Sequence, residues 1–309
     1  MVDVADPAPV AADAIAAARA SLAQLPCPSV ALGADRASVA GAQLLDRFDA
    51  AADSEAELTP IADTVRRAPL AALALVQLLR HNEGLDVHQG LIAESLVYST
   101  LQAGPEFTAW CAGRAAPPGR ASNLEPAVLA QRDGDRLNLT LNRPERRNAF
   151  SMEMRDALVE GLRVAACDPS IAELRLAGAG PAFCSGGDLD EFGTFLDPAT
   201  AHAVRSTRNP GRWLAACADR VRVDVHGACV GAGAELPAFA RHVVAAPDAT
   251  FQLPEVGMGL VPGAGGSVSL PRRIGRQRTA VLALSGRSID AATALAWGLV
   301  DEVAEAGGR

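Results

Sequence analysis

The 309-residue sequence contains no lysine, so every one of its 28 basic side chains is an arginine. Without a lysine amine, the chain cannot form a Schiff base with a carbonyl substrate or with pyridoxal phosphate. It also cannot supply the lysine of a P-loop nucleotide site. Phosphate binding stays open, because arginine recognises phosphate well.

Other absences concern metals, membranes and export. The six cysteines include no C-x-x-C pair and have no histidine at ligand spacing, which is typical of free thiols in a reducing compartment and argues against a metal site. The longest apolar run, residues 68–79, is too short to cross a bilayer. The first residues are acidic, unlike the basic start of a signal peptide. We therefore expect a cytoplasmic protein that binds no metal.

Charge and apolar content narrow the class further. The net charge is −8 and we find no basic stripe, which argues against nucleic acid and membranes as partners. Apolar residues make up 49% of the chain, enough to bury a sizeable core in one large or two ordinary domains.

The two halves of the chain differ in their apolar periodicity. Helical spacing recurs between residues 10 and 113, and a Pro/Gly-rich stretch at 111–127 follows it. We therefore predict a helical N-terminal module over 1–120 and a separate domain over 121–309. The helical stretches are 9–25, 41–53, 61–80 and 88–102.

The second half predicts alternating strands and helices. Residues 127–144 read as a β-hairpin around Asp133–Gly134, and Ser151 caps a helix over 151–166. A further helix is expected from about Asp188. Strand, turn and helix in repeated order indicate an α/β fold with a mainly parallel sheet. The expected strands are 171–180, 220–227, 241–248 and 249–255.

Two small-residue turns, 182–189 and 227–236, each follow a strand and precede a helix. Loops at the carboxyl ends of parallel strands form the ligand crevice of such sheets. Two backbone N–H groups that converge there on one oxygen would form an oxyanion hole, a large contribution to catalysis. The alternative is that the small residues only allow close packing of helix on sheet.

Two acidic residues lie beside these turns. Glu235 falls in the first turn of the second helix, and Glu255 follows a short strand. Two carboxyl groups close together in an apolar pocket cannot both ionise readily, so one would act as a base and the other as an acid. The alternatives are a helix-dipole partner for Glu235 and an exposed loop acid in Glu255.

Residues 127–304 resemble the crotonase, or enoyl-CoA hydratase/isomerase, superfamily. The resemblance is carried by five stretches in the family's order and spacing: "LNRPERRNAF", "AFCSGGDLDEF", "GACVGAGAEL", "ATFQLPEVGMGLVPGAGGSVSLPRRIG" and "ALAWGLVDEV". It implies an α/β fold with a crotonase-like ββα-superhelix core beside the N-terminal helical module.

The resemblance also implies roles for residues of this sequence. The amides of Gly187 and Ala232 would hold the thioester oxygen, and Glu235 and Glu255 match the two glutamates of hydratases. Residues matching the stretches that hold CoA are Glu145, Arg146, Arg147, Ser185, Asp188 and Leu189.

The implied activity is that of an enoyl-CoA hydratase-type lyase, which adds or removes water across the α,β bond of an acyl-CoA thioester. This activity needs no cofactor apart from the CoA of the substrate. The resemblance also implies a homo-oligomer, a trimer or hexamer. A cofactor-independent aryl-acetyl-CoA oxygenase or an enoyl-CoA isomerase of the same superfamily is the alternative. A non-catalytic acyl-CoA-binding or structural partner is a third.

The sequence departs from the family in several places. Ala232 replaces a common glycine, and Arg241 stands where an aspartate is usual. Gly263 occupies the position of an extra carboxylate in some isomerases and dehalogenases, which weighs against those branches. Family members continue for several helices past the last motif, and this sequence lacks them. It has instead an N-terminal segment, of which residues 82–110 resemble the helical extension of cofactor-independent dihydroxyphenylacetyl-CoA dioxygenases.

For three histidines and one cysteine that could also react, we predict structural roles. His202, His226 and His242 are interpreted as hydrogen-bonded structural histidines, and Cys184 as a small packing residue. The arginines at 205, 208 and 212 are equally consistent with contacts to CoA phosphates and with a solvated helix face.

Overall fold

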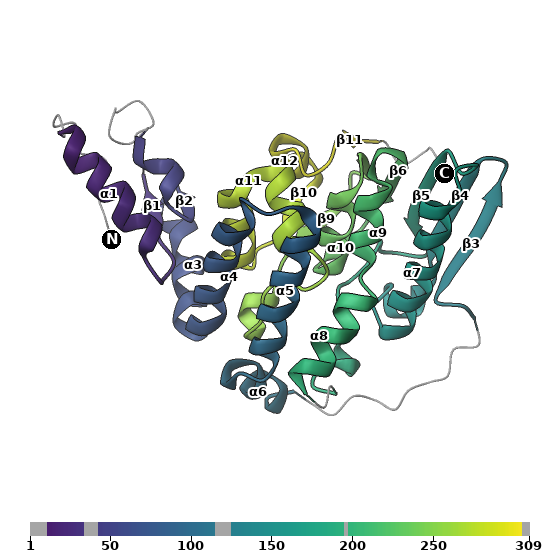
Figure 1. Ribbon diagram of the computed structural model, residues 1–309, viewed down its shortest axis with the longest axis horizontal. Coiled ribbons are helices and arrows are strands. Elements are labelled where there is room, and N and C mark those ends of the chain that lie inside the picture. Colours follow the sequence, from purple (N-terminus) through teal and green to yellow (C-terminus); the bar gives the residue numbers. More distant parts are fainter. Residues whose placement is uncertain (1–10, 34–42, 115–124, 195–196, 305–309) are drawn as a thin grey trace.

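The computed structural model describes residues 11–33, 43–114, 125–194 and 197–304. Helix α1 (Ala12–Gln24) and strands β1 (Val30–Leu32) and β2 (Ala50–Ala52) lie at one end of the molecule. The hairpin of β3 (Val128–Asp133) and β4 (Arg136–Leu141) lies at the other (Figure 1). Among the described residues, no helix combines the length and the apolar character that crossing a membrane requires.

A six-stranded sheet forms the frame of the second half. Its strand order is β11-β8-β6-β5-β4-β3, with all neighbours parallel except the β3–β4 hairpin. The predicted hairpin and the α/β class are therefore confirmed. The strands are β3 (Val128–Asp133), β4 (Arg136–Leu141), β5 (Glu173–Gly178), β6 (Val221–Val225), β8 (His242–Ala245) and β11 (Glu302–Val303).

A smaller sheet lies beside the first and carries the second small-residue turn. It has the order β10-β9-β7, where β7 (Ala228–Val230) runs parallel to β9 (Thr250–Gln252). The short β10 (Ile289–Asp290) pairs antiparallel with β9. Because β7 and β9 are neighbours, the residues that follow them come out at the same edge of this sheet.

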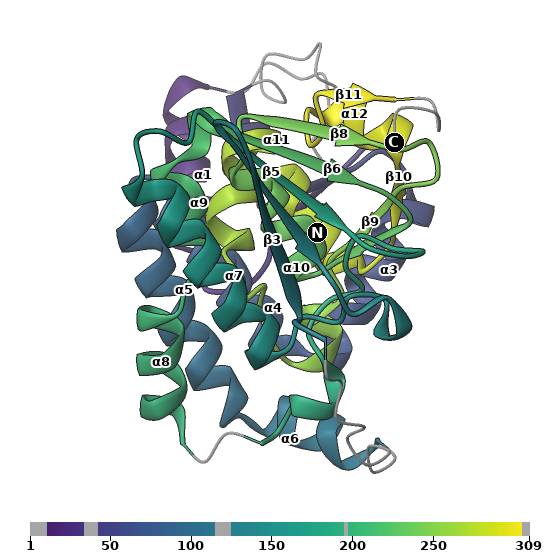
Figure 2. The ribbon, with the colours of Figure 1, turned by 90° about the vertical axis from the view of Figure 1, so that its right-hand side faces the viewer.

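Helices pack on the sheets and close the core (Figure 2). Ser151 accepts a hydrogen bond from the amide of Met154 and caps α7, as the sequence predicted. The helix expected from Asp188 is wrong, because a 3₁₀ turn at Leu189–Glu191 precedes α8. The helices of this half are α7 (Met152–Cys167), α8 (Pro198–Thr207), α9 (Pro210–Ala216), α10 (Ala232–Glu235), α11 (Gly266–Ser285) and α12 (Ala291–Trp297).

The N-terminal half is mainly helical, with one exception. Residues 41–53 were expected to be helical, but β2 (Ala50–Ala52) pairs in parallel with β1 (Val30–Leu32). Pairing between distant segments overrides local periodicity here, because it satisfies backbone groups of both strands. The helices are α1 (Ala12–Gln24), α3 (Glu55–Arg67), α4 (Pro69–Asn82), α5 (Val87–Gln102) and α6 (Pro105–Ala112).

The N-terminal helices share one apolar core with the second half. Leu75, Leu79 and Leu91 belong to the same buried cluster as Val268 and Leu282 of α11. Helices α3, α4 and α5 all pack against α11. The predicted boundary at 120/121 and part of the predicted linker lie outside the described residues. The domain assignment therefore stays a prediction, although α3–α5 pack directly on the half that carries the site.

Asp49 ties the two halves together. Its buried carboxylate pairs with Arg80 of α4 at 2.6 Å and with Arg276 of α11 at 3.1 Å, and it accepts hydrogen bonds from Ser29. Arg276 also pairs with Glu83 at 2.9 Å. Removing either arginine would leave the buried carboxylate of Asp49 partly unpaired, which is costly in free energy. The two ion pairs therefore fix α4 against α11.

Candidate active site

A cavity of about 150 Å³ opens at the carboxyl edge of the sheets. Glu235, Glu255, Gly187 and Ala232 all line it, so the four residues predicted to carry the chemistry share one cavity. Its remaining walls come from α5, α7, α8 and the loop after β5. These walls include Tyr98, Gln102, Phe150, Arg155, Asp188, Glu191, Phe192, Arg205, Arg208 and Gly263.

The amides of Gly187 and Ala232 are available for a ligand. Phe150 forms hydrogen bonds with the residues on either side of Gly187, which leaves the amide of Gly187 out of that pairing. Ala232 begins α10, and the first amides of a helix have no acceptor within it. In the described parts of the chain neither amide donates a hydrogen bond. An oxyanion hole at these two amides remains a prediction.

Glu235 is buried, with 2% of its surface exposed. Its Oε2 accepts hydrogen bonds from the amides of Ala264, at 2.7 Å, and Gly266, at 2.8 Å. Burial raises the pKa of Glu235 to about 7, although these amides oppose the shift by favouring the carboxylate. At neutral pH this acid is therefore close to its titration point.

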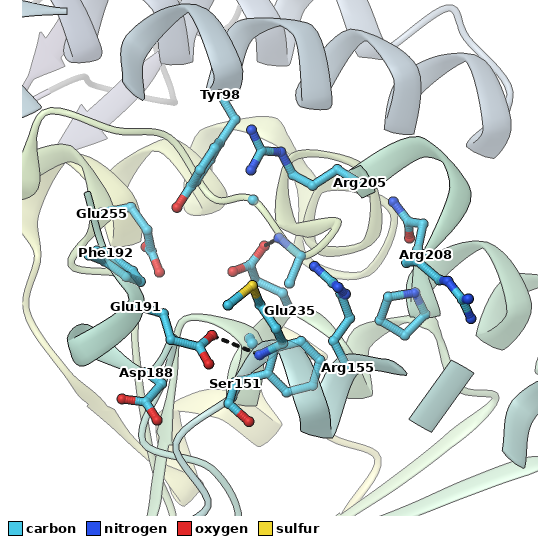
Figure 3. A pocket seen from close by; sticks show the side chains of 18 of the residues that line it. Tyr98, Ser151, Arg155, Asp188, Glu191, Phe192, Arg205, Arg208, Glu235 and Glu255 are labelled. Atoms are coloured by element: carbon cyan, nitrogen blue, oxygen red, sulfur yellow. Dashed lines mark hydrogen bonds between the residues drawn. The ribbon is translucent and has the colours of Figure 1, made fainter. Parts of the chain in front are cut away.

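Glu255 faces the same space from the turn after β9. Its Oε2 is buried and has no hydrogen-bond partner among the described residues. Burial raises the pKa of Glu255 well above its usual range, and the nearby charge of Glu235 raises it further. The protonated form is favoured. Figure 3 shows both carboxyl groups and the phenol oxygen of Tyr98 pointing into the cavity.

Gly231 makes this approach of Glu255 possible. Its φ of 50° and ψ of −116° suit glycine alone, and they turn the chain from β7 into α10. A Cβ at this position would collide with Oε1 of Glu255. The backbone conformation therefore requires glycine, and a Cβ at this position would also displace the end of the Glu255 side chain.

Another buried acid beside the site, Glu94, was not predicted. It comes from α5, and its carboxylate accepts hydrogen bonds from the amides of Gly265 and Ser267 and from the Ser267 hydroxyl. Burial raises the pKa of Glu94 to about 8, and the charge of Glu235 contributes. The signal that singled out Glu235, one acid among apolar residues of a helix, is also present around Glu94 in "GLIAESLVY".

Tyr98, the only tyrosine, is another residue that the sequence analysis missed. It also comes from α5, and its ring lies where a Cβ on Gly263 would be. No side chain fits at position 263. The Tyr98 ring therefore explains why the carboxylate that some family members carry at this position is absent here. Burial raises the pKa of the Tyr98 hydroxyl, so the group stays protonated and can donate a hydrogen bond.

The residues predicted to hold CoA come together beside the cavity. Ser185 donates its amide to the carbonyl of Arg147, which joins the loops after β4 and β5. Arg146 pairs with Asp188 and Asp190, and Arg143 pairs with Asp188 at 2.9 Å. Glu145 belongs to the same 3₁₀ turn as Arg146, and Leu189 is exposed. Their contact with CoA stays a prediction.

The other candidate residues have structural contacts. His226 bonds the carbonyl of Gly180 at 2.9 Å, His202 bonds Ser95 at 2.9 Å, and His242 lies 3.5 Å from Glu302. Burial raises the pKa of Cys184 to about 12, which disfavours a nucleophilic thiolate.

The three arginines of the α8–α9 region differ in whether they line the cavity. Arg205 and Arg208 line the cavity, whereas Arg212 lies over the ring of Trp213 and does not reach the cavity. No group of three or more histidine, cysteine or acidic side chains in the described ranges is arranged to hold a metal ion.

Known proteins match the second half of the chain. The family model described as enoyl-CoA hydratase/isomerase matches residues 136–306. A 1,2-epoxyphenylacetyl-CoA isomerase of Escherichia coli is 38% identical over 58% of this chain and 70% of its own length. A 2,3-dehydroadipyl-CoA hydratase of the same species is 38% identical over 57% and 68%. The crystal structure of an enoyl-CoA hydratase from Thermoplasma volcanium superposes with a TM-score of 0.54 at 34% identity, over 58% of this chain and 72% of that one.

Proposed function

Because the chain belongs to the enoyl-CoA hydratase/isomerase (crotonase) family, we propose that it hydrates the α,β double bond of a 2-enoyl-CoA thioester. The observation that carries this proposal is the shared cavity. Two carboxyl groups, Glu235 and Glu255, line it together with Gly187 and Ala232, whose amides have no other acceptor in the described structure.

The amides of Gly187 and Ala232 would receive the thioester oxygen. Addition of water at the β carbon pushes electrons onto that oxygen and forms an enolate. Two N–H dipoles fixed in place before the reaction stabilise this charge, at about 10²–10³ in rate for each donor.

The environments of the two acids assign their roles. Glu235 accepts two backbone hydrogen bonds, which favour its ionised form, so it takes a proton from water as the oxygen bonds to the β carbon. Glu255 is desolvated beside that charge, so it holds the proton that is delivered to the α carbon. The proton gained by Glu235 then returns to Glu255, which restores both groups.

Substitution of each acid tests the mechanism. Glu235→Gln and Glu255→Gln should each lower kcat for hydration by about 10²–10⁴, with affinity for the acyl-CoA changed only a few-fold. Hydration is followed by the loss of absorbance of the conjugated thioester across a panel of 2-enoyl-CoA substrates. Glu173→Gln, an exposed acid paired with Arg136 on the sheet, is the matched control. Unchanged kcat in both active-site variants would refute the mechanism.

Isomerisation is the second candidate, because one 38% identical relative is named an isomerase. The same two carboxyl groups could move a proton between carbons without adding water. Mass spectrometry separates the two reactions, since hydration adds the mass of water to the acyl-CoA and isomerisation leaves it unchanged.

The remaining family expectations are also proposals. We propose a homo-oligomer, a trimer or hexamer, that works in the cytoplasm without a cofactor beyond the CoA of its substrate. Native mass spectrometry tests the assembly. Assay of the dialysed protein after treatment with a chelator tests the cofactor requirement.

A further inference from the structure

The charges that line the cavity are segregated by sign. Figure 3 shows Glu191 and Glu255 on one side, and three arginines, Arg155, Arg205 and Arg208, on the other. Helix α7 supplies the first arginine, and α8 and its C-terminal end supply the other two. The cavity therefore connects the two glutamates of the proposed chemistry with a cationic end.

Arg205 is held firmly at this end. Its guanidinium lies 4.4 Å from the centre of the Tyr98 ring, and its Nη2 donates to Ser99 and to Gln102 at 2.7 Å each. All three partners belong to α5. This helix lies outside the region that matches the family model, so the N-terminal half orients a cation at the far end of the site.

Arg155 faces the cavity from the first turn of α7. Its side chain is 14% exposed, and it reaches the neighbouring Asp156 through Nε and Nη2. A guanidinium has five N–H donors, so this contact leaves further donors of Arg155 for a ligand. Arg208 is 45% exposed and pairs with Glu160 at 2.8 Å, which places it nearer to solvent.

Arg155 and Arg205 line the same end of the cavity, and their positive charges repel each other. Burial lowers the pKa of Arg205, Tyr98 and Glu94 oppose this shift, and the charge of Arg155 adds to it. A bound anion between the two cations would relieve this repulsion. Guanidinium groups suit carboxylates in particular, because their planar donors can bind both oxygens.

Resting on the hydratase function proposed above, we propose that Arg155 and Arg205 bind a carboxylate at the end of the acyl group remote from the thioester. The substrate would then be a short dicarboxylic enoyl-CoA. A cavity of about 150 Å³ takes a molecule of about the size of benzene, which matches a short acyl group beyond the thioester.

The phosphates of CoA are the other source of anionic oxygens. They are separated from the thioester by the whole pantetheine arm, whereas the cavity joins these arginines directly to Glu235 and Glu255. Most residues expected to hold CoA, Arg146 and Ser185 among them, do not line the cavity. Asp188 does, but it lies on the side away from the arginines (Figure 3). The position of the arginines therefore favours the acyl carboxylate.

Calorimetry with two saturated ligands of equal chain length tests this selectivity without turnover. Glutaryl-CoA, which ends in a carboxylate, should bind about tenfold or more tightly than pentanoyl-CoA, which ends in a methyl group. Arg155→Gln should remove most of this preference while leaving pentanoyl-CoA and free CoA unchanged. Arg155→Lys, which keeps the charge but not the planar donors, should retain part of it.

Arg163→Gln is the matched control. It lies on the same helix, pairs with Glu160 and is 52% exposed outside the cavity. It should leave the preference for glutaryl-CoA intact. Thermal unfolding of each variant verifies that the fold is retained.

Three results would overturn the inference. The first is equal binding of the two ligands by the wild type, and the second is a preference that survives Arg155→Gln. The third is an equal loss for free CoA and both acyl-CoAs in that variant, which would place these cations on the CoA phosphates.

Turnover separates this inference from the proposed function. Hydration of pent-2-enoyl-CoA and of 4-carboxybut-2-enoyl-CoA, in which a carboxylate replaces the terminal methyl group, at equal kcat/KM would keep the hydratase and refute the carboxylate site. Selective binding of glutaryl-CoA, with no hydration of either enoyl-CoA, would keep the carboxylate site and refute the hydratase.

Discussion

Glu94 and Glu235 bind alternate amides of the same turn at the start of α11. Glu235 accepts from Ala264 and Gly266, and Glu94 accepts from Gly265 and from Ser267. One acid belongs to the family-matched half and the other to the N-terminal helices. The position of a proposed catalytic acid is therefore fixed by a turn that both halves of the chain hold.

Replacement of Glu94 should act on stability and leave the titration of Glu235 in place. The pKa of Glu94 is raised to about 8, above the value of about 7 for Glu235, so Glu94 is largely protonated while Glu235 titrates. Glu94→Gln therefore removes little negative charge, and the acidic limb of the pH–rate profile should stay near pH 7. The variant also places an NH₂ group against a backbone N–H, which should cost about 1–3 kcal/mol in the free energy of unfolding.

The pH dependence of kcat/KM and urea denaturation measure these two properties. Glu55→Gln, an exposed acid of the same half, should change neither. Movement of the acidic limb to lower pH in Glu94→Gln would show that Glu94 carries a negative charge while Glu235 titrates.

The wild-type pH–rate profile should be bell-shaped. Glu235 must be ionised to accept a proton, and its pKa is raised to about 7, so kcat/KM should rise with pH through that value. Glu255 must be protonated, and its pKa is raised well above the usual range, so activity should fall again at higher pH. An acidic limb near pH 4.5, the ordinary value for a glutamate, would contradict the assignment of Glu235.

Gly231→Ala should damage both the fold and the site. The new Cβ meets Oε1 of Glu255 and forces a non-glycine residue into a φ of 50° with a ψ of −116°. We expect a loss of about 1–3 kcal/mol in the free energy of unfolding and a fall in kcat, measured by urea denaturation and by hydration assay. Gly257→Ala is the control, because nothing lies within 4 Å of a Cβ there. Equal effects of the two substitutions would disprove the steric argument.

Asp49→Ala should be among the most destabilising substitutions outside the site. It leaves the buried ends of Arg80 and Arg276 without their shared carboxylate, at an expected cost of about 3–5 kcal/mol. Asp63→Ala removes an exposed pair with Arg66 and should cost less than about 1 kcal/mol. Urea denaturation compares the two, and similar values would mean that Asp49 does not join the halves as described.

The second half of the fold could be predicted well from local patterns. The hairpin around Gly134 and the helix capped by Ser151 depend on residues close in sequence, and both are present. The predictions for 41–53 and for a helix at Asp188 failed. In the first case β2 pairs with a distant strand, and in the second the carboxylate of Asp188 accepts the amide of Asp190 and pairs with Arg143. Neither contact leaves a periodic trace in the sequence.

By itself, the sequence determined the α/β class and the family and singled out Glu235, Glu255, Gly187 and Ala232 as candidates, because spaced motifs and turn residues are local properties of the chain. The tertiary structure alone decided that Tyr98 and Arg155 meet these residues at one cavity and that Glu94 binds the turn at the start of α11. Their approach depends on how α5 and α7 pack against α11 and the sheet. Packing joins residues that are far apart in sequence, and no local pattern records which of them will touch.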